Sequence, residues 1–189
     1  MILGSHNSWS YKTPIKWWMK LLAFTARCQD LNIKEQYELG VRCFDLRLKF
    51  KKDVPIIAHG IIVYGGIPYE DLEYLNSKKD VYIRIVHEVR NEKQYTANSI
   101  ANFIEYCYNL SNTYKNITFW YGRNLYNSEE DYHFVYNPSC REIYSSVCSP
   151  RLIDDWYPRW FAKNNNKNID ENSIQEDILL IDFVNYGRK

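Results

Sequence analysis

The sequence predicts an α/β fold: a compact TIM-type (β/α) barrel that is incomplete or distorted. Short apolar segments that end in polar residues and lead into a helix or a loop recur along the chain, a pattern typical of parallel strands joined by crossovers. About seven such segments can be counted in 189 residues, which suits a small barrel better than a doubly wound sheet. No GxGxxG, GxxxxGKS or GxxxxGKT motif occurs, so no motif supports a nucleotide-binding sheet.

Length and composition favour a single domain over residues 1–189. The chain is 46% hydrophobic with 17 tyrosines, which argues against disorder. Its formal net charge of +1 does not suggest nucleic acid as a partner. No apolar run reaches the roughly 18–20 residues that span a bilayer. The abundance of Lys, Asn, Ile and Tyr is typical of an AT-rich genome, such as that of a virus or parasite. Oligomeric state is left open.

Cysteine usage and the first residues bear on the compartment. No basic segment followed by an apolar signal-peptide core is visible, so we expect a cytoplasmic protein. The cysteines are odd in number and form no CxxC pair, which is unlike a disulfide framework or a zinc site. We therefore expect reduced, mostly buried thiols at Cys28, Cys43, Cys107, Cys140 and Cys148.

The first strand is expected to begin almost at Met1. It runs into the small-residue turn Gly4–Ser8, which holds His6. A helix-capping turn with an incidental histidine is the ordinary alternative. A second histidine at another predicted strand end makes that alternative weaker.

A helix is expected next, over Thr13–Leu22, because Pro14 suits its first position and Thr13 could cap it. The adjacent Trp17 and Trp18 cannot both face inward on a helix. At least one should be exposed beside two lysines, an arrangement typical of a membrane-interface element. The alternative is that the pair packs against a neighbouring loop.

A short helix over Asn32–Leu39, ended by Gly40, leads into the most informative strand, Val41–Leu48. Strand alternation places Asp45 and Arg47 on the same face. The next strand, over residues 55–58, runs directly into His59. An acid, a guanidinium and an imidazole thus follow neighbouring strands, and in a closed parallel barrel the strand ends carry the chemistry. The ordinary alternative is a surface salt bridge beside an unrelated histidine.

The rest of the chain continues the same plan. The sequence does not decide whether His87 or Glu88 faces the site, or whether Arg84 faces the barrel interior or a helix. The remaining expected elements are a glycine-rich loop (Gly60–Pro68), helices (Tyr69–Asn76 and Tyr95–Tyr114), strands (Val81–Val86, Ile117–Tyr121, Leu152-Ile153 and Ile178–Ile181) and a polar surface loop (Lys163–Asn172).

Several segments resemble motifs of the X-domain of phosphatidylinositol-specific phospholipase C, in family order and at similar spacing. The bacterial, metal-independent branch is the more similar one. The chain is shorter than those enzymes, with abbreviated connections in its second half. The stronger matches fill roughly the first third of the chain and weaker ones continue to its end: Gly4–Ser8, Pro14–Lys16, Gly40–Arg47 and His59-Gly60, then Arg123, Asp155-x-Tyr157 and Asp182.

The resemblance implies a chemistry and roles for particular residues. The family cleaves its lipid by attack of the inositol 2-hydroxyl on phosphorus, releasing diacylglycerol and inositol 1,2-cyclic phosphate. That reaction needs a general base, a general acid and positive charge at the phosphorane oxygens. His6 matches the base, and Asp182 the carboxylate that orients it. His59 matches the acid, with Asp45 nearby in support, and Arg47 matches the phosphate clamp.

Two departures from the family patterns concern metal. Asn7 stands where bacterial members have an aspartate, and Arg47 stands where calcium-dependent members have a metal-binding carboxylate. Ca²⁺ takes several oxygen ligands. Asn7, Asp45 and Glu88 could supply some of them, but Arg47 would sit in the place of the cation. The expectation is a metal-free site without a cofactor, in which Ca²⁺ is the less favoured alternative.

Substrate recognition rests on weaker matches. Arg123 and Asp155 resemble positions that hydrogen-bond the inositol hydroxyls, and Tyr157 resembles the aromatic residue under the ring. Glu88 lies where the family has a charged ligand-binding residue, and Asn7 is a further candidate. The ordinary alternatives are a surface arginine, a loop aspartate and a packed tyrosine.

Three functions are therefore considered. The first is a phospholipase C acting on phosphatidylinositol or its glycosylated forms, with the membrane surface as a peripheral partner. The second is a phosphodiesterase that acts on glycerophosphodiesters or another phosphodiester. Such enzymes normally need a carboxylate-bound metal, which the Asp45-Leu46-Arg47 sequence disfavours. The third is a non-catalytic lipid-binding module of the same fold.

Overall fold

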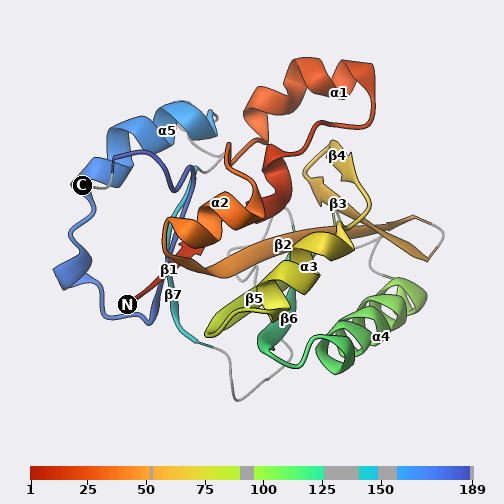
Figure 1. Ribbon diagram of the computed structural model, residues 1–189. Coiled ribbons are helices and arrows are strands. Elements are labelled where there is room, and N and C mark those ends of the chain that lie inside the picture. The colour runs from red at the N-terminus through yellow and green to blue at the C-terminus, as the bar shows by residue number, and fades with distance from the viewer. Residues whose placement is uncertain (52, 90–95, 126–140, 149–156, 188–189) are drawn as a thin grey trace.

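The computed structural model describes residues 1–51, 53–89, 96–125, 141–148 and 157–187 (Figure 1). All eight described strands belong to one curled sheet. The α/β class predicted from the sequence is confirmed. None of the helices in the described part of the chain has the length and apolar character of a membrane span.

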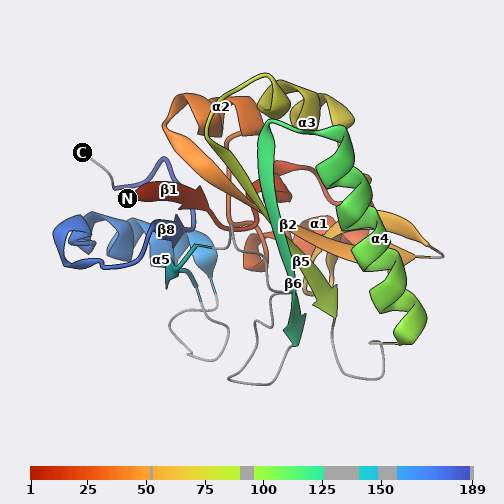
Figure 2. The ribbon, with the colours of Figure 1, turned by 90° about the horizontal axis from the view of Figure 1, so that it is seen from below.

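The parallel strands follow one another in the order β7-β8-β1-β2-β5-β6. Figure 2 shows how β5 and β6 turn away from the direction of β1, so that the sheet curls into a half-barrel. Within the described segments β6 and β7 do not pair with each other. The sheet therefore stays open there, and the predicted incomplete barrel is confirmed. The strands are Ile2–Ser5 (β1), Val41–Lys51 (β2), Val81–Val89 (β5), Ile117–Leu125 (β6), Ile143–Ser146 (β7) and Ile178–Ile181 (β8).

The expectation of parallel strands throughout is wrong for β3 (Val54–His59) and β4 (Ile62–Gly65). β2 runs three residues further than predicted, and its last part, Leu48–Lys51, pairs antiparallel with β3. β4 then pairs antiparallel with β3 through a two-residue turn, in which Gly60 has a φ of 56°. The expected glycine-rich loop is therefore largely a hairpin, and His59 lies at its turn.

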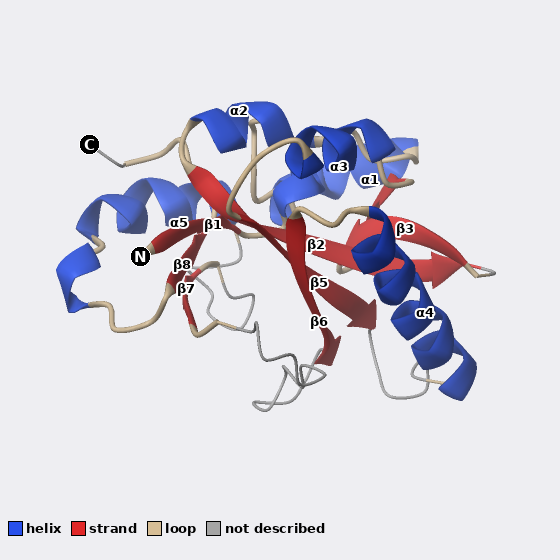
Figure 3. Cartoon of the chain, turned by 60° about the horizontal axis from the view of Figure 1, so that its bottom comes forward, coloured by secondary structure: helices blue, strands red, loops and turns tan. Residues whose placement is uncertain are grey.

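The helices lie outside the sheet. Figure 3 shows α2 and α3 over one face, with α4 alongside β6. Asn32 and Glu35 form a capping box that begins α2, and Gly40, with a φ of 97°, follows its end. The helices are Trp17–Leu22 (α1), Ile33–Glu38 (α2), Tyr69–Asn76 (α3), Ala97–Thr113 (α4) and Pro158–Asn165 (α5), with short 3-10 turns at Ser8–Tyr11, Ala23–Thr25, Asn166–Asn168 and Glu171–Ser173.

The sequence reading differs from the structure at three further places. α1 begins at Trp17 and not at Pro14, because the amide of Ile15 donates to the carbonyl of Val63 in β4 and keeps this segment extended. The expected polar loop over 163–172 instead holds the end of α5, one 3-10 turn and the start of the last one. β7 was not predicted, since its sequence IYSS has little apolar character. The strand expected at residues 152–153 lies outside the described residues.

β2 is buried on both faces, and this places polar groups inside the half-barrel. Phe44, Leu46 and Leu48 belong to the hydrophobic core, where burial of such a side chain is worth roughly 1.5–3 kcal/mol. Asp45 and Arg47, at the alternate positions, are equally buried. Since a barrel interior is normally filled by Val, Ile and Leu, ionic groups there indicate a site.

The described cysteines are free, as expected, and Cys140 lies outside the described residues.

Candidate active site

His6 and Asp182 come together because they follow two paired strands. β1 and β8 are in register up to Ser5 and Ile181, so the next residue of each strand falls at the same edge of the sheet. His6 Nδ1 lies 2.7 Å from Asp182 Oδ1, and both side chains are buried. The carboxylate accepts from Nδ1–H, which leaves the lone pair of a neutral imidazole on Nε2. This is the arrangement of an oriented general base.

Gln29 holds these two strand ends together, and the sequence analysis missed it. Its Nε2 donates to the carbonyls of His6 and Ile181 at 3.1 and 3.0 Å. Its Oε1 accepts from the amide of Val184 at 3.1 Å. Gln29 is fully buried, but a single glutamine in an irregular segment carries no sequence signal. Its role depends on contacts with residues up to 155 positions away.

Arg47 lies between two carboxylates. Its Nε donates to Asp45 Oδ2 at 2.8 Å, and its Nη1 donates to Glu88 Oε2 at 3.2 Å. Arg84 approaches Asp45 from β5, with Nη1 3.5 Å from Oδ1. Burial alone would raise the pKa of both Asp45 and Glu88. Arg47, together with Arg84 at Asp45 and with His59 and the Gly60 amide at Glu88, outweighs burial, so that both pKa values lie below the ordinary range.

The register of β5 against β2 decides which side chains of β5 face this site. Asp45 pairs with Arg84, so Arg84 and Glu88 share its face of the sheet. His87 points to the opposite side, where its ring stacks on Phe103 of α4 with centroids 4.8 Å apart. Both questions that the sequence left open are thereby answered: Glu88 faces the site, and Arg84 faces the barrel interior.

His59 lies edge-on to His6, with ring centroids 5.4 Å apart. Its Nδ1 is 3.0 Å from the carbonyl oxygen of Ala26. Burial lowers the pKa of His59 to about 4, and the nearby carboxylate of Glu88 opposes that shift. Glu88 also accepts from the amide of Gly60 at 2.7 Å through Oε1. The site thus holds two imidazoles face to edge.

The support expected for His59 from Asp45 is not what the structure shows. Asp45 Oδ2 instead lies 3.9 Å from Nε2 of His6, in addition to its contacts with Arg47 and Arg84. The carboxylate that acts on His59 is Glu88. The physical reason is that the end of β3 lies beside Glu88, whose Oε1 accepts from the amide of Gly60, the residue after His59.

Asn7 adopts a left-handed backbone conformation with a φ of 45°, which asparagine tolerates better than most residues. Its amide donates to Asp45 Oδ2 at 3.0 Å, and its Nδ2 donates to the carbonyl of Ala26 at 3.3 Å. That carbonyl also accepts from the hydroxyl of Tyr64. The side-chain Oδ1 of Asn7 is buried and has no hydrogen-bond partner within the described part of the chain.

The carboxylates that could bind a calcium ion are already ion-paired. Asp45 and Glu88 would be its main oxygen ligands, but both already bind Arg47. A positive charge, that of the Arg47 guanidinium, thus lies between the two carboxylates.

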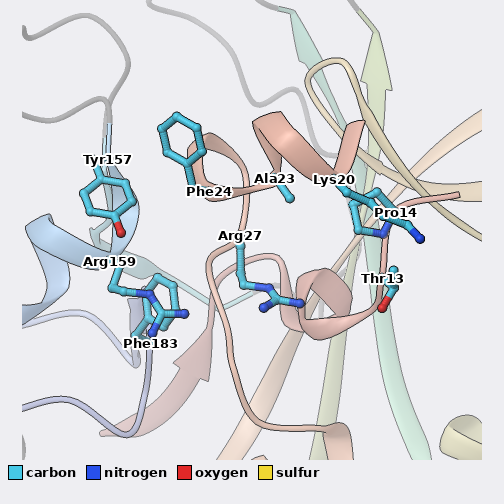
Figure 4. Close-up of a pocket in the computed structure, with 9 residues that line it drawn as sticks. All are labelled: Thr13, Pro14, Lys20, Ala23, Phe24, Arg27, Tyr157, Arg159 and Phe183. Atoms are coloured by element: carbon cyan, nitrogen blue, oxygen red, sulfur yellow. The ribbon is translucent and has the colours of Figure 1, made fainter. Parts of the chain in front are cut away.

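The other predicted substrate-binding residues are not placed with this cluster. Asp155 lies outside the described residues. Arg123 lies on β6 with its backbone opposite His87, and its side chain is not among the described ones. Tyr157 precedes α5 and makes a T-shaped contact with Phe24, with centroids 5.8 Å apart. Figure 4 shows Tyr157 at one wall of a pocket of about 380 Å³, with Arg27 at its centre.

Exposed apolar side chains gather on and around α1. Trp17 is 74% exposed and Trp18 37%, so both tryptophans face outward. Lys16 Nζ lies 6.0 Å from the ring centre of Trp18. At least one tryptophan is therefore exposed, as expected, whereas Trp18 has more than half of its surface covered by the protein. We call this group the α1 ridge: Ile15, Trp17, Trp18, Leu21, Leu22 and Phe24.

No protein-family model matches the chain, and no curated protein sequence matches it either. Solved structures do. Phosphatidylinositol-specific phospholipase C from Staphylococcus aureus superposes with a TM-score of 0.63 at 15% identity, covering 98% of this chain and 86% of that one. A mutant of that enzyme gives 0.60 at 15% identity over the same shares. The enzyme from Listeria monocytogenes gives 0.56 at 16% identity, covering 96% and 87%. The chain therefore has the fold of the bacterial phosphatidylinositol-specific phospholipases C.

Proposed function

We propose that the chain is a phospholipase C that cleaves phosphatidylinositol, or a glycosylated form of it, to diacylglycerol and inositol 1,2-cyclic phosphate. The observation that carries the proposal is the grouping of three functional parts inside the half-barrel. These parts are the His6–Asp182 pair, His59 at a ring distance of 5.4 Å, and Arg47 held by two carboxylates. They match the base, the acid and the phosphate clamp that an intramolecular transfer at phosphorus needs.

In this mechanism Nε2 of His6 takes the proton of the inositol 2-hydroxyl, and Asp182 stabilises the imidazolium that forms. The oxygen then attacks phosphorus, and Arg47 stabilises the charge on the phosphorane oxygens. His59 donates a proton to the departing glycerol oxygen. Because burial lowers the pKa of His59, the imidazole takes up this proton from solvent when the substrate binds, since the phosphodiester anion beside it favours the charged form.

The two other functions are less well supported by the same geometry. A metal-dependent phosphodiesterase would need Asp45 and Glu88 free to bind a cation, and Arg47 binds both. A non-catalytic lipid-binding module would not need an oriented base. The hydrogen bond between His6 and Asp182, which Gln29 supports from behind, favours catalysis.

The proposal is tested by ³¹P NMR of the purified protein with phosphatidylinositol vesicles. We expect the lipid diester signal to be replaced by that of a five-membered cyclic phosphodiester. Release of a phosphomonoester alone, or turnover of glycerophosphoinositol but not of the lipid, would instead favour the second function. Vesicle binding without any new phosphorus signal would favour the third.

Turnover is expected to be independent of metal, because a guanidinium already lies between the carboxylates. The rate in excess EDTA should equal the rate in untreated buffer, and added Ca²⁺ should not increase it. The same ³¹P assay measures both rates. Activity that is lost in chelator and restored by Ca²⁺ would contradict the metal-free site.

The α1 ridge is proposed to hold the enzyme on the bilayer. Replacing Trp17 and Trp18 with Ala should lower vesicle affinity by about tenfold or more, since burying an aromatic side chain is worth roughly 1.5–3 kcal/mol and tenfold is about 1.4 kcal/mol. Cleavage of a soluble, short-chain substrate should be unchanged. Tyr108, which is 65% exposed on α4, provides the matched control: Tyr108→Ala should leave both measurements unchanged. Equal loss on both substrates in the Trp variant would make the pair structural.

A further inference from the structure

Cys28 lies in the candidate active site, and the proposed mechanism gives it no task. Its side chain is fully buried, with Sγ 3.7 Å from Nδ1 of His59. Sγ, a ring nitrogen of His6 and a carboxylate oxygen of Asp182 all lie within 4.8 Å of one another. Burial and the nearby Asp182 raise the pKa of the thiol well above its ordinary value, so it is not an activated nucleophile.

These atoms form a ligand set suited to a borderline-soft cation. Zn²⁺ binds thiolate, imidazole and carboxylate in tetrahedral sites, with bonds of about 2.0–2.3 Å that place ligand atoms roughly 3.3–3.6 Å apart. The 3.7 Å between Cys28 and His59 is close to that spacing. The ligand atoms of His6, Cys28 and Asp182 need to move by only about 1 Å from their present separations to reach the spacing of a tetrahedral zinc site. Calcium and magnesium prefer oxygen ligands, so the set discriminates against them.

The ligands are also held on fixed backbone. Gln29 ties the ends of β1 and β8, which carry His6 and Asp182. Asp182 Oδ2 accepts from the amide of Cys148 at 2.8 Å. Cys28 is fixed through its own backbone, because its amide donates to the hydroxyl of Ser10 and its carbonyl accepts from Phe183. Such preorganisation lowers the cost of assembling a metal site.

We propose that His6, Cys28 and Asp182, with His59 as a fourth ligand, form an inhibitory site for Zn²⁺ and similar thiophilic divalent cations. Binding deprotonates the thiol, and that proton goes to the buffer. His6 would bind through Nδ1, which already faces Asp182, so its remaining proton moves to Nε2. His59 would likewise bind through Nδ1, which gives up its contact with the carbonyl of Ala26 and leaves its proton on Nε2. A protonated Nε2 on His6 cannot accept the proton of a hydroxyl, and the base is lost. Only this inhibition rests on the proposed function; the binding itself does not.

The test measures binding first, without substrate. Co²⁺ is added to the chelator-treated protein, and the thiolate-to-cobalt charge-transfer band is followed in the near ultraviolet. We expect one equivalent to bind and Zn²⁺ to displace it. Cys28→Ser should abolish the band and weaken binding by about 100-fold or more, because loss of even an outer partner of a metal ligand costs 10–100-fold. His59→Ala should weaken binding while leaving the charge-transfer band in place.

The matched control is Cys107→Ala, which removes another buried free thiol on α4, away from the site. This variant should keep the band and the affinity. A band that survives Cys28→Ser, or one that disappears in Cys107→Ala, would overturn the proposal. So would the absence of a thiolate band in the wild-type protein.

Turnover then separates this proposal from the proposed function. Each variant is compared with its own metal-free rate in the ³¹P assay. We expect Zn²⁺ to inhibit the wild type and Cys107→Ala, and to leave Cys28→Ser uninhibited. Cleavage that Zn²⁺ does not inhibit would refute the metal site and leave the phospholipase intact. A Cys28-dependent cobalt band in a protein that cleaves no phosphatidylinositol would refute the phospholipase and leave the metal site intact.

Discussion

Replacing Arg47 with Ala should reduce turnover of phosphatidylinositol by about 10³-fold, because loss of a single charge-stabilising donor typically costs 10²–10³ and arginine at a transferring phosphoryl group often contributes more. The residue also separates two buried carboxylates, at 2.8 Å from Asp45 and 3.2 Å from Glu88. Its removal leaves Glu88 without its largest counter-charge. We therefore expect a second effect, on stability, of about 3–5 kcal/mol.

The two effects can be separated by a second change. Arg47→Ala combined with Glu88→Gln removes both the guanidinium and the carboxylate that it neutralises. The double variant should regain much of the free energy of unfolding, measured by denaturant titration, while turnover stays low. If Glu88→Gln restores turnover as well, the loss in the single variant came from misfolding and not from a missing phosphate clamp.

Arg47→Lys tests what kind of charge the site needs. Lysine keeps the positive charge but cannot bridge two carboxylates and a phosphate with a planar set of donors. We expect its stability to be close to that of the wild type and its turnover to remain about 10²-fold lower. Turnover near the wild-type rate would show that charge alone suffices.

The pH dependence of stability should change sign in Arg47→Ala. In the wild type the lowered pKa of Glu88 means that its stabilising contribution is present above the unfolded pKa and is lost as the pH falls through the folded one. Without Arg47, burial is the largest remaining influence and raises that pKa. The folded variant then binds its proton more tightly than the unfolded chain, so the stability it lacks at neutral pH should partly return on acidification.

The sequence predicts those parts of the fold that depend on local pattern. The helix expected over Asn32–Leu39 from the helical spacing of its residues is found at Ile33–Glu38, and the common face of Asp45 and Arg47 follows from strand alternation. β8 is predicted at its observed residues because its continuous apolar run, ILLI, is buried at every position. The roles assigned to site residues stay predictions, although the structure brings His6, Asp45 and Asp182 together.

What the sequence could not predict depends on pairing between distant segments. Whether Glu88 or His87 faces the site is decided by the register of β5 on β2, and a shift of one residue would exchange them. The β3–β4 hairpin lacks an Asn-Gly or Asp-Gly signal at Gly60. Ala26 acts through its backbone carbonyl, which no residue pattern can reveal. The sequence analysis expected Asp45 to support His59, because the contact of His59 with Glu88 also depends on how distant segments pair.

The division of labour between the two histidines gives the last expected result. General acid and base groups contribute about 10²–10⁴-fold each, so His6→Ala and His59→Ala should both be severe on the natural lipid. A substrate whose leaving group is a phenol of low pKa needs little protonation. On that substrate His59→Ala should recover much of its rate. His6→Ala should not recover, because the inositol hydroxyl still has to lose its proton.

Two further variants calibrate this comparison. Asp182→Asn should behave like His6→Ala but more mildly, because Asp182 only orients the imidazole at 2.7 Å and stabilises its charge. His87→Gln removes a histidine that stacks on Phe103 on the other side of the sheet, so its effect should be the same on both substrates. Rescue of His6→Ala by the phenol, with no rescue of His59→Ala, would reverse the two roles. The proton would then be removed by the imidazole held at the carbonyl of Ala26, and the His6–Asp182 pair would be the acid.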